Sequence, residues 1–216
     1  WNDNVGKEDG NFDFIMGDDV DFSKSEVVEQ LTKWGLWYTE RARLDGFRID
    51  AVKSIDSSFF RPWLEKMSAV GNRPAFAVGE YWSGNSQELA DYIEGSGHCM
   101  RLFDVPLHFK LQQASYQPAS YDLHQLFANT ITSWEPDYSC IFVDNHDTQP
   151  GQALESWVAD DFKTRAYATI LLRDASSPFV FYGDLWGIPH DGKQPVPFMR
   201  EMVWVRSHLL GDELVD

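Results

Sequence analysis

The sequence is poor in cysteine and in basic residues, and it lacks long apolar runs. Only Cys99 and Cys140 are present among 216 residues, too few for a disulfide framework, and each opens an apolar run, which favours buried thiols. Eighteen basic residues against 34 acidic ones give a formal net charge of -16, which disfavours nucleic acid as a partner. No apolar run approaches the roughly 20 residues that span a bilayer, so we expect no membrane partner. No glycine-rich phosphate loop follows any apolar run, which disfavours a nucleotide-binding domain.

Short apolar runs alternate with amphipathic stretches along the chain. The runs are rich in β-branched and aromatic residues and are bounded by Gly, Pro, Asp or Ser, as is typical of buried strands. They predict strands at residues 44–50, 75–81, 100–105, 140–144 and 178–182.

Helical spacing of apolar residues predicts the segments between these strands. Ser23 and Glu26 form a possible capping box at the start of the first helix. Its predicted core stripe is Val27, Leu31, Trp34 and Tyr38, and that of the next helix is Phe59, Trp63, Met67 and Val70. Further helices are predicted at 86–95, 121–132, 157–174 and 196–210.

This alternation predicts an α/β fold with a parallel sheet and right-handed crossovers, either open or closed into a barrel. A complete (β/α)₈ barrel needs about 250 residues, so five strands would be part of one. Residues 1–22 are rich in Asp, Asn and Gly and read as an irregular loop, so we place a domain boundary between 1–22 and 23–216.

Three acidic residues stand at the ends of three different predicted strands. Asp50 ends the first, Glu80 lies near the end of the second, and Asp147 follows the fourth. In a parallel α/β barrel these strand ends form the floor of the active site, so the three carboxylates are expected to meet in one pocket. A lone acidic residue at such a place is most often a helix cap, but three of them favour a catalytic site.

The surroundings of two of these carboxylates differ. Arg48 and Asp50 share one face of a strand, and an adjacent guanidinium keeps a carboxylate ionised, as a nucleophile requires. Glu80 lies between apolar and aromatic residues, where desolvation would raise its pKa and let it donate a proton. Two carboxyl groups with pKa values pushed apart are typical of glycoside hydrolysis.

Four segments resemble the motifs of the α-amylase family of glycoside hydrolases, closest to the liquefying, bacterial-type enzymes and their fungal relatives. They are residues 16–22 (MGDDVDF), 46–53 (GFRIDAVK), 79–82 (GEYW) and 142–147 (FVDNHD). The resemblance implies a partial (β/α)₈ barrel from about its fourth strand onward, preceded by the end of an irregular calcium-binding B domain. It also implies endo-hydrolysis of α-1,4-glucosidic bonds in starch, glycogen and maltooligosaccharides, with retention of configuration.

The resemblance also assigns roles to residues. It implies Asp50 as nucleophile, Glu80 as general acid/base and Asp147 as the carboxylate that stabilises the transition state. The implied substrate contacts are Arg48, Lys53, Tyr81, Trp82, Asn145 and His146. It implies calcium as the cofactor, with ligands from Asp13, Asp19, Asp21 and the backbone carbonyl of Ser54.

The sequence departs from the family pattern at three places. Ser54 stands where the family usually has His, and Ser23 stands where relatives often carry another Asp. An early motif on the first strands is absent, so we expect the 216-residue chain to be a fragment, inactive by itself and poorly stable, with an unpaired sheet edge. Separately, we expect the protein to be a monomer. A transglycosylating or maltooligosaccharide-forming enzyme and a catalytically decayed glucan-binding protein stay open as alternatives, and the compartment is not predicted.

Overall fold

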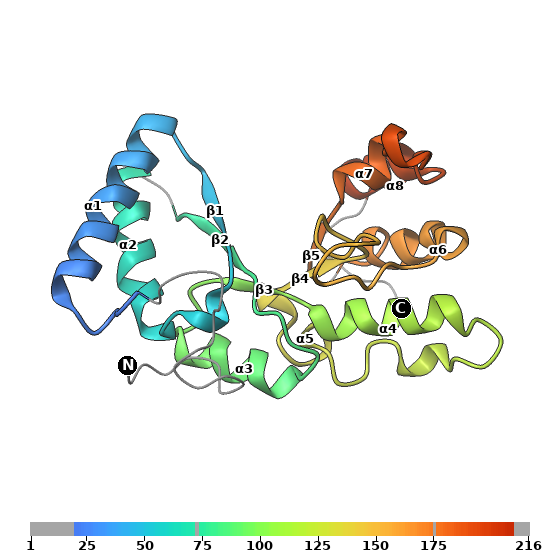
Figure 1. Cartoon of the computed structure of the whole chain (residues 1–216), viewed down its shortest axis with the longest axis horizontal. Helices are drawn as coiled ribbons and strands as arrows, with labels where there is room; N and C mark the ends of the chain where they lie inside the picture. Colours follow the sequence, from blue (N-terminus) through green and yellow to red (C-terminus); the bar gives the residue numbers. More distant parts are fainter. Residues whose placement is uncertain (1–19, 72–73, 175, 210–216) are drawn as a thin grey trace. The chain divides into compact units, whose positions relative to one another are not determined.

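The computed structural model describes residues 20–71, 74–174 and 176–209 (Figure 1). The described residues divide into two compact units. The first holds residues 20–71, 74–83 and 87–103, and the second holds residues 84–86, 104–174 and 176–209. No helix in the described ranges has the length and apolarity of a membrane-spanning helix. All five predicted strands are present, so the alternating α/β pattern is confirmed.

The first unit holds three parallel strands in chain order: β1 (Gly46–Ile49), β2 (Phe76–Gly79) and β3 (Arg101–Phe103). Ile49 is opposite Gly79, and Gly79 is opposite Leu102. The helical elements are α1 (Ser25–Ala42), η2 (Val52–Ser54), η3 (Ser57–Phe59), α2 (Phe60–Gly71) and α3 (Ser86–Gly95). Helices α1 and α2 contact each other beside β1 and β2 (Figure 1). Among the described residues, β1 lies at the edge of the strand order and pairs with β2 alone.

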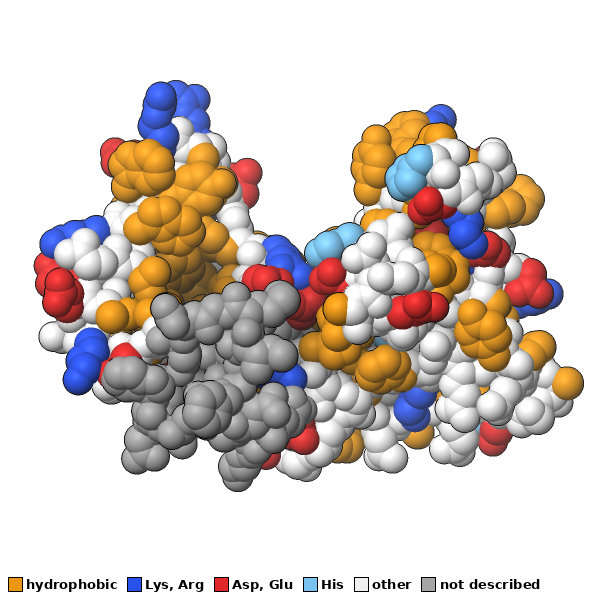
Figure 2. All heavy atoms as spheres, in the orientation of Figure 1, with side chains coloured by type: hydrophobic (Ala, Val, Ile, Leu, Met, Phe, Trp, Pro, Cys, Tyr) orange, Lys and Arg blue, Asp and Glu red, His pale blue; other side chains and the backbone are white. Residues whose placement is uncertain are grey.

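Helix α1 buries a different face from the predicted one. Its buried residues are Thr32, Gly35 and Thr39, whereas Trp34 is 52% exposed and Tyr38 is 42% exposed. A Cβ atom added at Gly35 would lie 2.6 Å from the Trp63 ring of α2. Small residues therefore allow the two helices to approach closely, while large aromatic ones lie on the surface, where Figure 2 shows apolar side chains gathered on this part of the first unit.

The predicted capping box of α1 is also wrong. The helix begins at Ser25 with Lys24 as its N-cap and no side-chain cap. The Ser23 hydroxyl and amide donate instead to Asp21 Oδ1, at 2.5 and 2.9 Å. The local hydrogen bond to an aspartate two residues away therefore replaces the helix cap. In α2, Trp63 and Met67 are buried as predicted, but Val70 is 44% exposed.

The second unit holds two parallel strands, β4 (Ser139–Phe142) and β5 (Ser177–Phe179), with Cys140 opposite Ser177. Helices α4 (Val105–Tyr116), α6 (Asp160–Leu171) and α8 (Met199–His208) contribute to its core. This core includes Leu107 and Leu111, Ile141, Tyr167 and Ile170, and Met199. The shorter elements are η4 (Leu123–Gln125), α5 (Ile131–Trp134), η5 (Pro136–Tyr138), α7 (Tyr182–Trp186) and η6 (Pro189–Asp191).

The second unit differs from the sequence-based prediction in three places. The sequence reading missed α4, which begins after the buried Asp104, whose carboxylate accepts from the Leu107 amide at 3.0 Å as an N-cap. The helix predicted at 121–132 is instead two short elements, η4 and α5. The last strand ends at Phe179, and Tyr182, assigned to that strand, begins α7. The helices at 157–174 and 196–210 are confirmed in shorter form as α6 and α8.

Candidate active site

The end of β1 presents Arg48 and Asp50 on the face that alternation predicts. Phe47 points the other way and packs on α2, with its ring centroid 5.0 Å from that of Trp63. The Arg48 guanidinium forms an ion pair with the Asp50 carboxylate. The Asp50 side chain is 70% exposed, so its carboxylate is open to a ligand.

Glu80 follows β2 directly and is held beside Arg48 by the parallel ladder. Its amide donates to Ile49 O at 2.8 Å, and its carbonyl accepts from the Val52 amide at 3.0 Å. Arg48 Nη2 lies 3.0 Å from Glu80 Oε1. This contact is an ion pair without hydrogen-bond geometry. Oε1 is buried and accepts no hydrogen bond from the described residues.

The pKa of Glu80 is raised above its ordinary value. Burial is the largest cause, and Arg48 opposes it by favouring the ionised form. A hydrogen bond with Asp50 and the negative charge of Asp50 raise the pKa further, while a hydrogen bond from the Ala51 backbone lowers it. Glu80 is 7% exposed. One carboxyl group is therefore buried and inclined to hold a proton, while its neighbour is exposed and paired with a cation.

Two small residues allow this arrangement. A Cβ atom at Gly79 would lie 2.9 Å from Met100 Sδ and 3.1 Å from Val52 Cγ1, so the strand can pack closely here only as glycine. Ala51 adopts the left-handed conformation with φ 45° and ψ 41°, which turns the chain immediately after Asp50. This turn directs the Val52 amide to Glu80.

The other predicted site residues of the first unit lie close to this pair in sequence. Lys53 and Ser54 lie in η2, and Tyr81 and Trp82 follow Glu80; all four are half-buried. The Tyr92 hydroxyl donates to Val52 O at 2.7 Å and so fixes η2 against α3. The Tyr81 ring lies 5.1 Å from the Tyr92 ring.

The second unit carries Asn145, His146 and Asp147 in one turn after β4. Asn145 is buried, and its Oδ1 accepts from the amides of Asp147 at 2.8 Å and Thr148 at 3.0 Å. His146 Nε2 lies 3.1 Å from Asp147 Oδ2, and their side chains are 63% and 33% exposed. Asn145 thus closes the turn, while His146 and Asp147 extend outward from it. That Asp147 meets Asp50 and Glu80 in one pocket stays a prediction.

The sequence reading gave no role to Asp144, which lies beneath this turn and is fully buried. Burial raises its pKa to about 7 despite the Lys163 ammonium, which favours the ionised form. The sequence did hold one indication that Asp144 matters to the site. It lies in the segment FVDNHD, which also supplies Asn145, His146 and Asp147.

The predicted calcium ligands lie partly outside the described residues, which include neither Asp13 nor Asp19. Asp21 is described, and its pKa is lowered, mainly by the hydrogen bond from the Ser23 side chain. Within the described ranges there is no group of three or more His, Cys, Asp or Glu side chains placed to hold a metal ion. The calcium site therefore stays a prediction.

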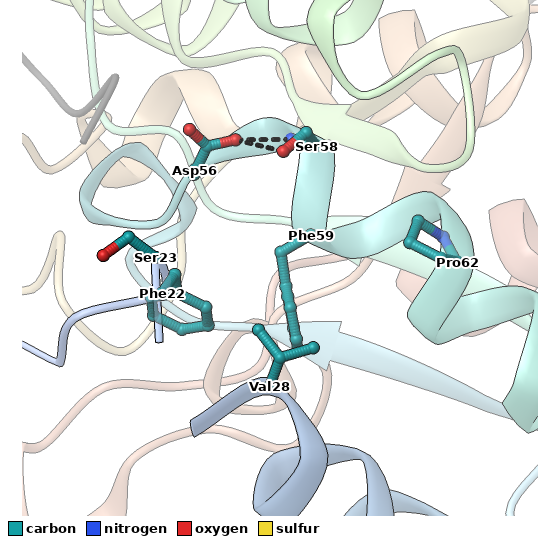
Figure 3. A pocket seen from close by; sticks show the side chains of 7 residues that line it. All are labelled: Phe22, Ser23, Val28, Asp56, Ser58, Phe59 and Pro62. Carbon is teal, nitrogen blue, oxygen red and sulfur yellow. Dashed lines mark hydrogen bonds between the residues drawn. The ribbon is translucent and has the colours of Figure 1, made fainter. Parts of the chain in front are cut away.

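A pocket of the first unit lies between α1 and the start of α2 and holds none of the predicted site residues (Figure 3). It is lined mainly by apolar side chains, including Phe22, Val28 and Phe59. On one wall Asp56 caps η3 by accepting from the Ser58 amide at 2.9 Å and from its hydroxyl at 2.6 Å. This carboxylate is therefore a capping group.

Comparison with known proteins identifies the family of the chain. The family model described as "Alpha amylase, catalytic domain" matches residues 11–201. The chain is 47% identical over 189 residues to "Alpha-amylase" of Geobacillus stearothermophilus, covering 88% of this chain and 34% of that protein. It is 43% identical over 203 residues to "Glucan 1,4-alpha-maltohexaosidase" of Bacillus sp. (strain 707), covering 94% of this chain and 39% of that protein.

A solved structure of an Anoxybacillus alpha-amylase is similar with a TM-score of 0.65 at 20% identity, covering 87% of this chain and 45% of that chain. This likeness, together with the parallel strands, confirms an α/β fold that forms part of a (β/α)₈ barrel. The chain spans only 34% and 39% of the length of the two curated relatives.

Proposed function

Because the chain belongs to the α-amylase catalytic-domain family, we propose that it carries the central catalytic residues of a retaining endo-hydrolase of α-1,4-glucosidic bonds. Its substrates would be starch, glycogen and maltooligosaccharides. Asp50 is the nucleophile, Glu80 the general acid/base and Asp147 the third carboxylate.

The reaction has two steps. Protonated Glu80 donates its proton to the glycosidic oxygen while Asp50 attacks the anomeric carbon, which breaks the glycosidic bond and forms a glycosyl ester. The ionised Glu80 then takes a proton from water, the water oxygen attacks the anomeric carbon, and the ester bond to Asp50 breaks. Two inversions give retention.

The remaining site residues bind and orient the sugar. Arg48 orients Asp50 through their ion pair. His146 acts with Asp147 on the sugar of the cleavage subsite, and Asn145 holds the turn that carries them. Tyr81 and Trp82 offer aromatic faces to neighbouring sugars, and Lys53 contacts the leaving-group side.

The observation that carries the proposal is the shared guanidinium. Arg48 pairs with exposed Asp50 and with buried Glu80, whose pKa is raised. A nucleophile must be ionised and an acid catalyst protonated before the first step. The difference in burial between two carboxyl groups on one cation supports that division of roles.

The test places these residues in a complete enzyme. Residues 11–201 would replace the matching segment of the Geobacillus stearothermophilus protein, and cleavage of maltoheptaose would be followed by NMR. We expect the α-anomer to form first, and Glu80→Gln to lower the rate by about 10²–10⁴-fold. Glu94→Gln, whose side chain is 81% exposed on α3, is the matched control and leaves the rate unchanged. A Glu80→Gln variant as active as its parent would refute the assignment and favour the decayed glucan-binding protein.

A second candidate is an enzyme that transfers glucosyl units or releases maltooligosaccharides of fixed length. The relative named "Glucan 1,4-alpha-maltohexaosidase" and the serine at position 54 support it. Products of the grafted enzyme from maltoheptaose, with and without added glucose as acceptor, distinguish the candidates. Hydrolysis alone leaves the product pattern independent of the acceptor.

Calcium is the proposed structural ion, with Asp13, Asp19, Asp21 and the Ser54 carbonyl as ligands. Calcium prefers oxygen ligands, which this set supplies, and the lowered pKa of Asp21 keeps its carboxylate ionised. We expect calcium chloride to raise the melting temperature of the 216-residue chain and EDTA to reverse the effect. Asp21→Asn weakens the response, whereas Asp122→Asn, on the cap of η4, does not. We also propose that the protein acts as a monomer, away from membranes.

A further inference from the structure

The second unit contains a lysine that is almost completely buried. Lys163 of α6 is 1% exposed, and its Nζ lies 3.0 Å from Asp144 Oδ2 and 2.6 Å from Asp184 Oδ1. Its ammonium also lies 3.0 Å from the centroid of the Trp157 ring. A buried ammonium is costly unless it is paired and hydrogen-bonded, so both carboxylates are required partners.

The two carboxylates differ in what they contact next. Asp184 Oδ2 accepts from the Tyr167 hydroxyl at 2.6 Å, so Asp184 connects two residues of the same helix, Lys163 and Tyr167 of α6. Asp144 Oδ1 accepts from the Thr148 hydroxyl at 2.8 Å. Asp144 is therefore the carboxylate through which Lys163 reaches the turn after β4.

Thr148 completes the turn that carries the exposed site residues. Its hydroxyl oxygen accepts from the Asn145 amide at 3.0 Å, and its own amide donates to Asn145 Oδ1 at 3.0 Å. Asn145 Oδ1 also holds the Asp147 amide at 2.8 Å. A continuous set of polar contacts thus runs from Lys163 through Asp144, Thr148 and the Asn145 side chain to the backbone of Asp147.

We propose that Lys163 is a positioning residue for the sugar-binding turn at residues 145–148. It holds Asp144, and Asp144 holds Thr148, so that His146 and Asp147 extend from a fixed backbone. The inference rests on the proposed function in one respect, that this turn binds sugar. A lysine that only filled the core would have no specific effect on the turn.

The test measures amide hydrogen exchange in the 216-residue chain by NMR. In Lys163→Met we expect the Asp147 and Thr148 amides to exchange about tenfold faster, relative to the Tyr167 and Ile170 amides of α6, because the turn loses its anchor. Thr148→Val removes the bridging hydroxyl without touching Lys163 and has the same effect on the Asp147 amide. Lys163→Arg keeps the charge and restores at least part of the protection.

Lys193→Met is the matched control. Lys193 contacts Asp160 at 2.5 Å and lies 5.5 Å from the Trp157 ring centroid, so it shares the surroundings of Lys163 but makes no contact with Asp144. It should leave the exchange of the turn unchanged. If Lys163→Met does not fold, Asp144→Asn, which keeps the size of the side chain, takes its place. The expected result is the same faster exchange of the Asp147 and Thr148 amides relative to those of α6.

Three results would overturn the proposal: unchanged exchange at Asp147 and Thr148 in a folded variant, equal acceleration throughout α6, or the same acceleration in Lys193→Met. A separate titration of the wild-type chain with maltohexaose tests sugar binding through the His146 and Asp147 resonances. If these resonances do not move, the turn is not shown to bind sugar in this chain, which weakens the proposed function. The exchange data still decide whether Lys163 positions the turn.

Discussion

Arg48 Nη2 lies 3.0 Å from Oε1 of Glu80, and the same guanidinium pairs with Asp50. The cation therefore contacts both carboxyl groups, and it favours the ionised form of Glu80.

Replacing Arg48 changes the ionisation of Glu80. Arg48 lowers the pKa of Glu80 against the effect of burial, so Arg48→Gln should raise that pKa further. The measurement is a pH titration of the ¹³C-labelled Glu80 carboxyl by NMR. Arg41→Gln, on the last turn of α1, is the control and leaves the titration unchanged. A lower Glu80 pKa in Arg48→Gln would contradict the prediction.

Replacing Asp50 has the opposite effect on the same group. Asp50 raises the pKa of Glu80 through a hydrogen bond and through its negative charge. Asp50→Asn removes the charge, so the Glu80 pKa should fall. In the grafted enzyme the same change should abolish turnover, because the proposed function assigns the nucleophile to Asp50. An unchanged Glu80 titration would show that the two side chains do not interact in solution.

His108 and Asp144 give pH dependences of stability with opposite signs. Burial lowers the pKa of His108 from 6.5 to about 4, so the unfolded chain binds this proton first and stability falls as pH drops from 6.5 to 4. The pKa of Asp144 is raised from 3.8 to about 7, so the folded chain keeps this proton longer and stability falls as pH rises from about 4 to about 7. The two effects oppose each other over most of this range.

Urea unfolding at several pH values separates the two groups. The stability of wild type relative to Asp144→Asn should decrease from pH 4 to 7. The stability of wild type relative to His108→Gln should increase from pH 4 to 6.5, by on the order of 3 kcal/mol at most. Differences that do not vary with pH would show that neither group is buried in the form described.

Gly79→Ala tests the close packing beneath Glu80. The added methyl group would lie 2.9 Å from Met100 Sδ and 3.0 Å from Leu102 Cδ2, so we expect a loss of about 1–3 kcal/mol in the free energy of unfolding. Gly71→Ala is the control, because nothing lies within 4 Å of its added Cβ and alanine favours a helix. Equal stability of the two variants would show that the strand can shift to accept the methyl group.

The local pattern was sufficient for the strands and for the acidic residues at their ends. A strand can be recognised from the apolar pattern of only a few consecutive residues. Asp50 and Glu80 directly follow the strands β1 and β2 that position them. Helix α4 was missed although Asp104 and Pro106 are good start signals, because it buries residues on several sides and shows no clean polar face.

Two other features could not be read from local patterns. On α1 the spacing predicted a buried stripe with Trp34, but close packing on Trp63 requires the small Gly35 in that place. Lys163 finds its partners at Asp144 and Asp184, which are 19 and 21 residues away in sequence. Neither helical nor strand periodicity relates residues this far apart. The contact of Lys163 with Asp144 beneath the turn is therefore found only from the structure.

The backbone conformation at Ala51 restricts which residues can follow Asp50 in the sequence. Its left-handed conformation, with φ 45°, costs about 1–2 kcal/mol for a residue with a Cβ atom, and more for a β-branched one. Homologous sequences with the same turn should therefore hold Ala, Gly, Asn or Asp at this position and exclude Val, Ile and Thr. A mutational library at position 51 would show the same narrow acceptance even where the side chain touches no sugar.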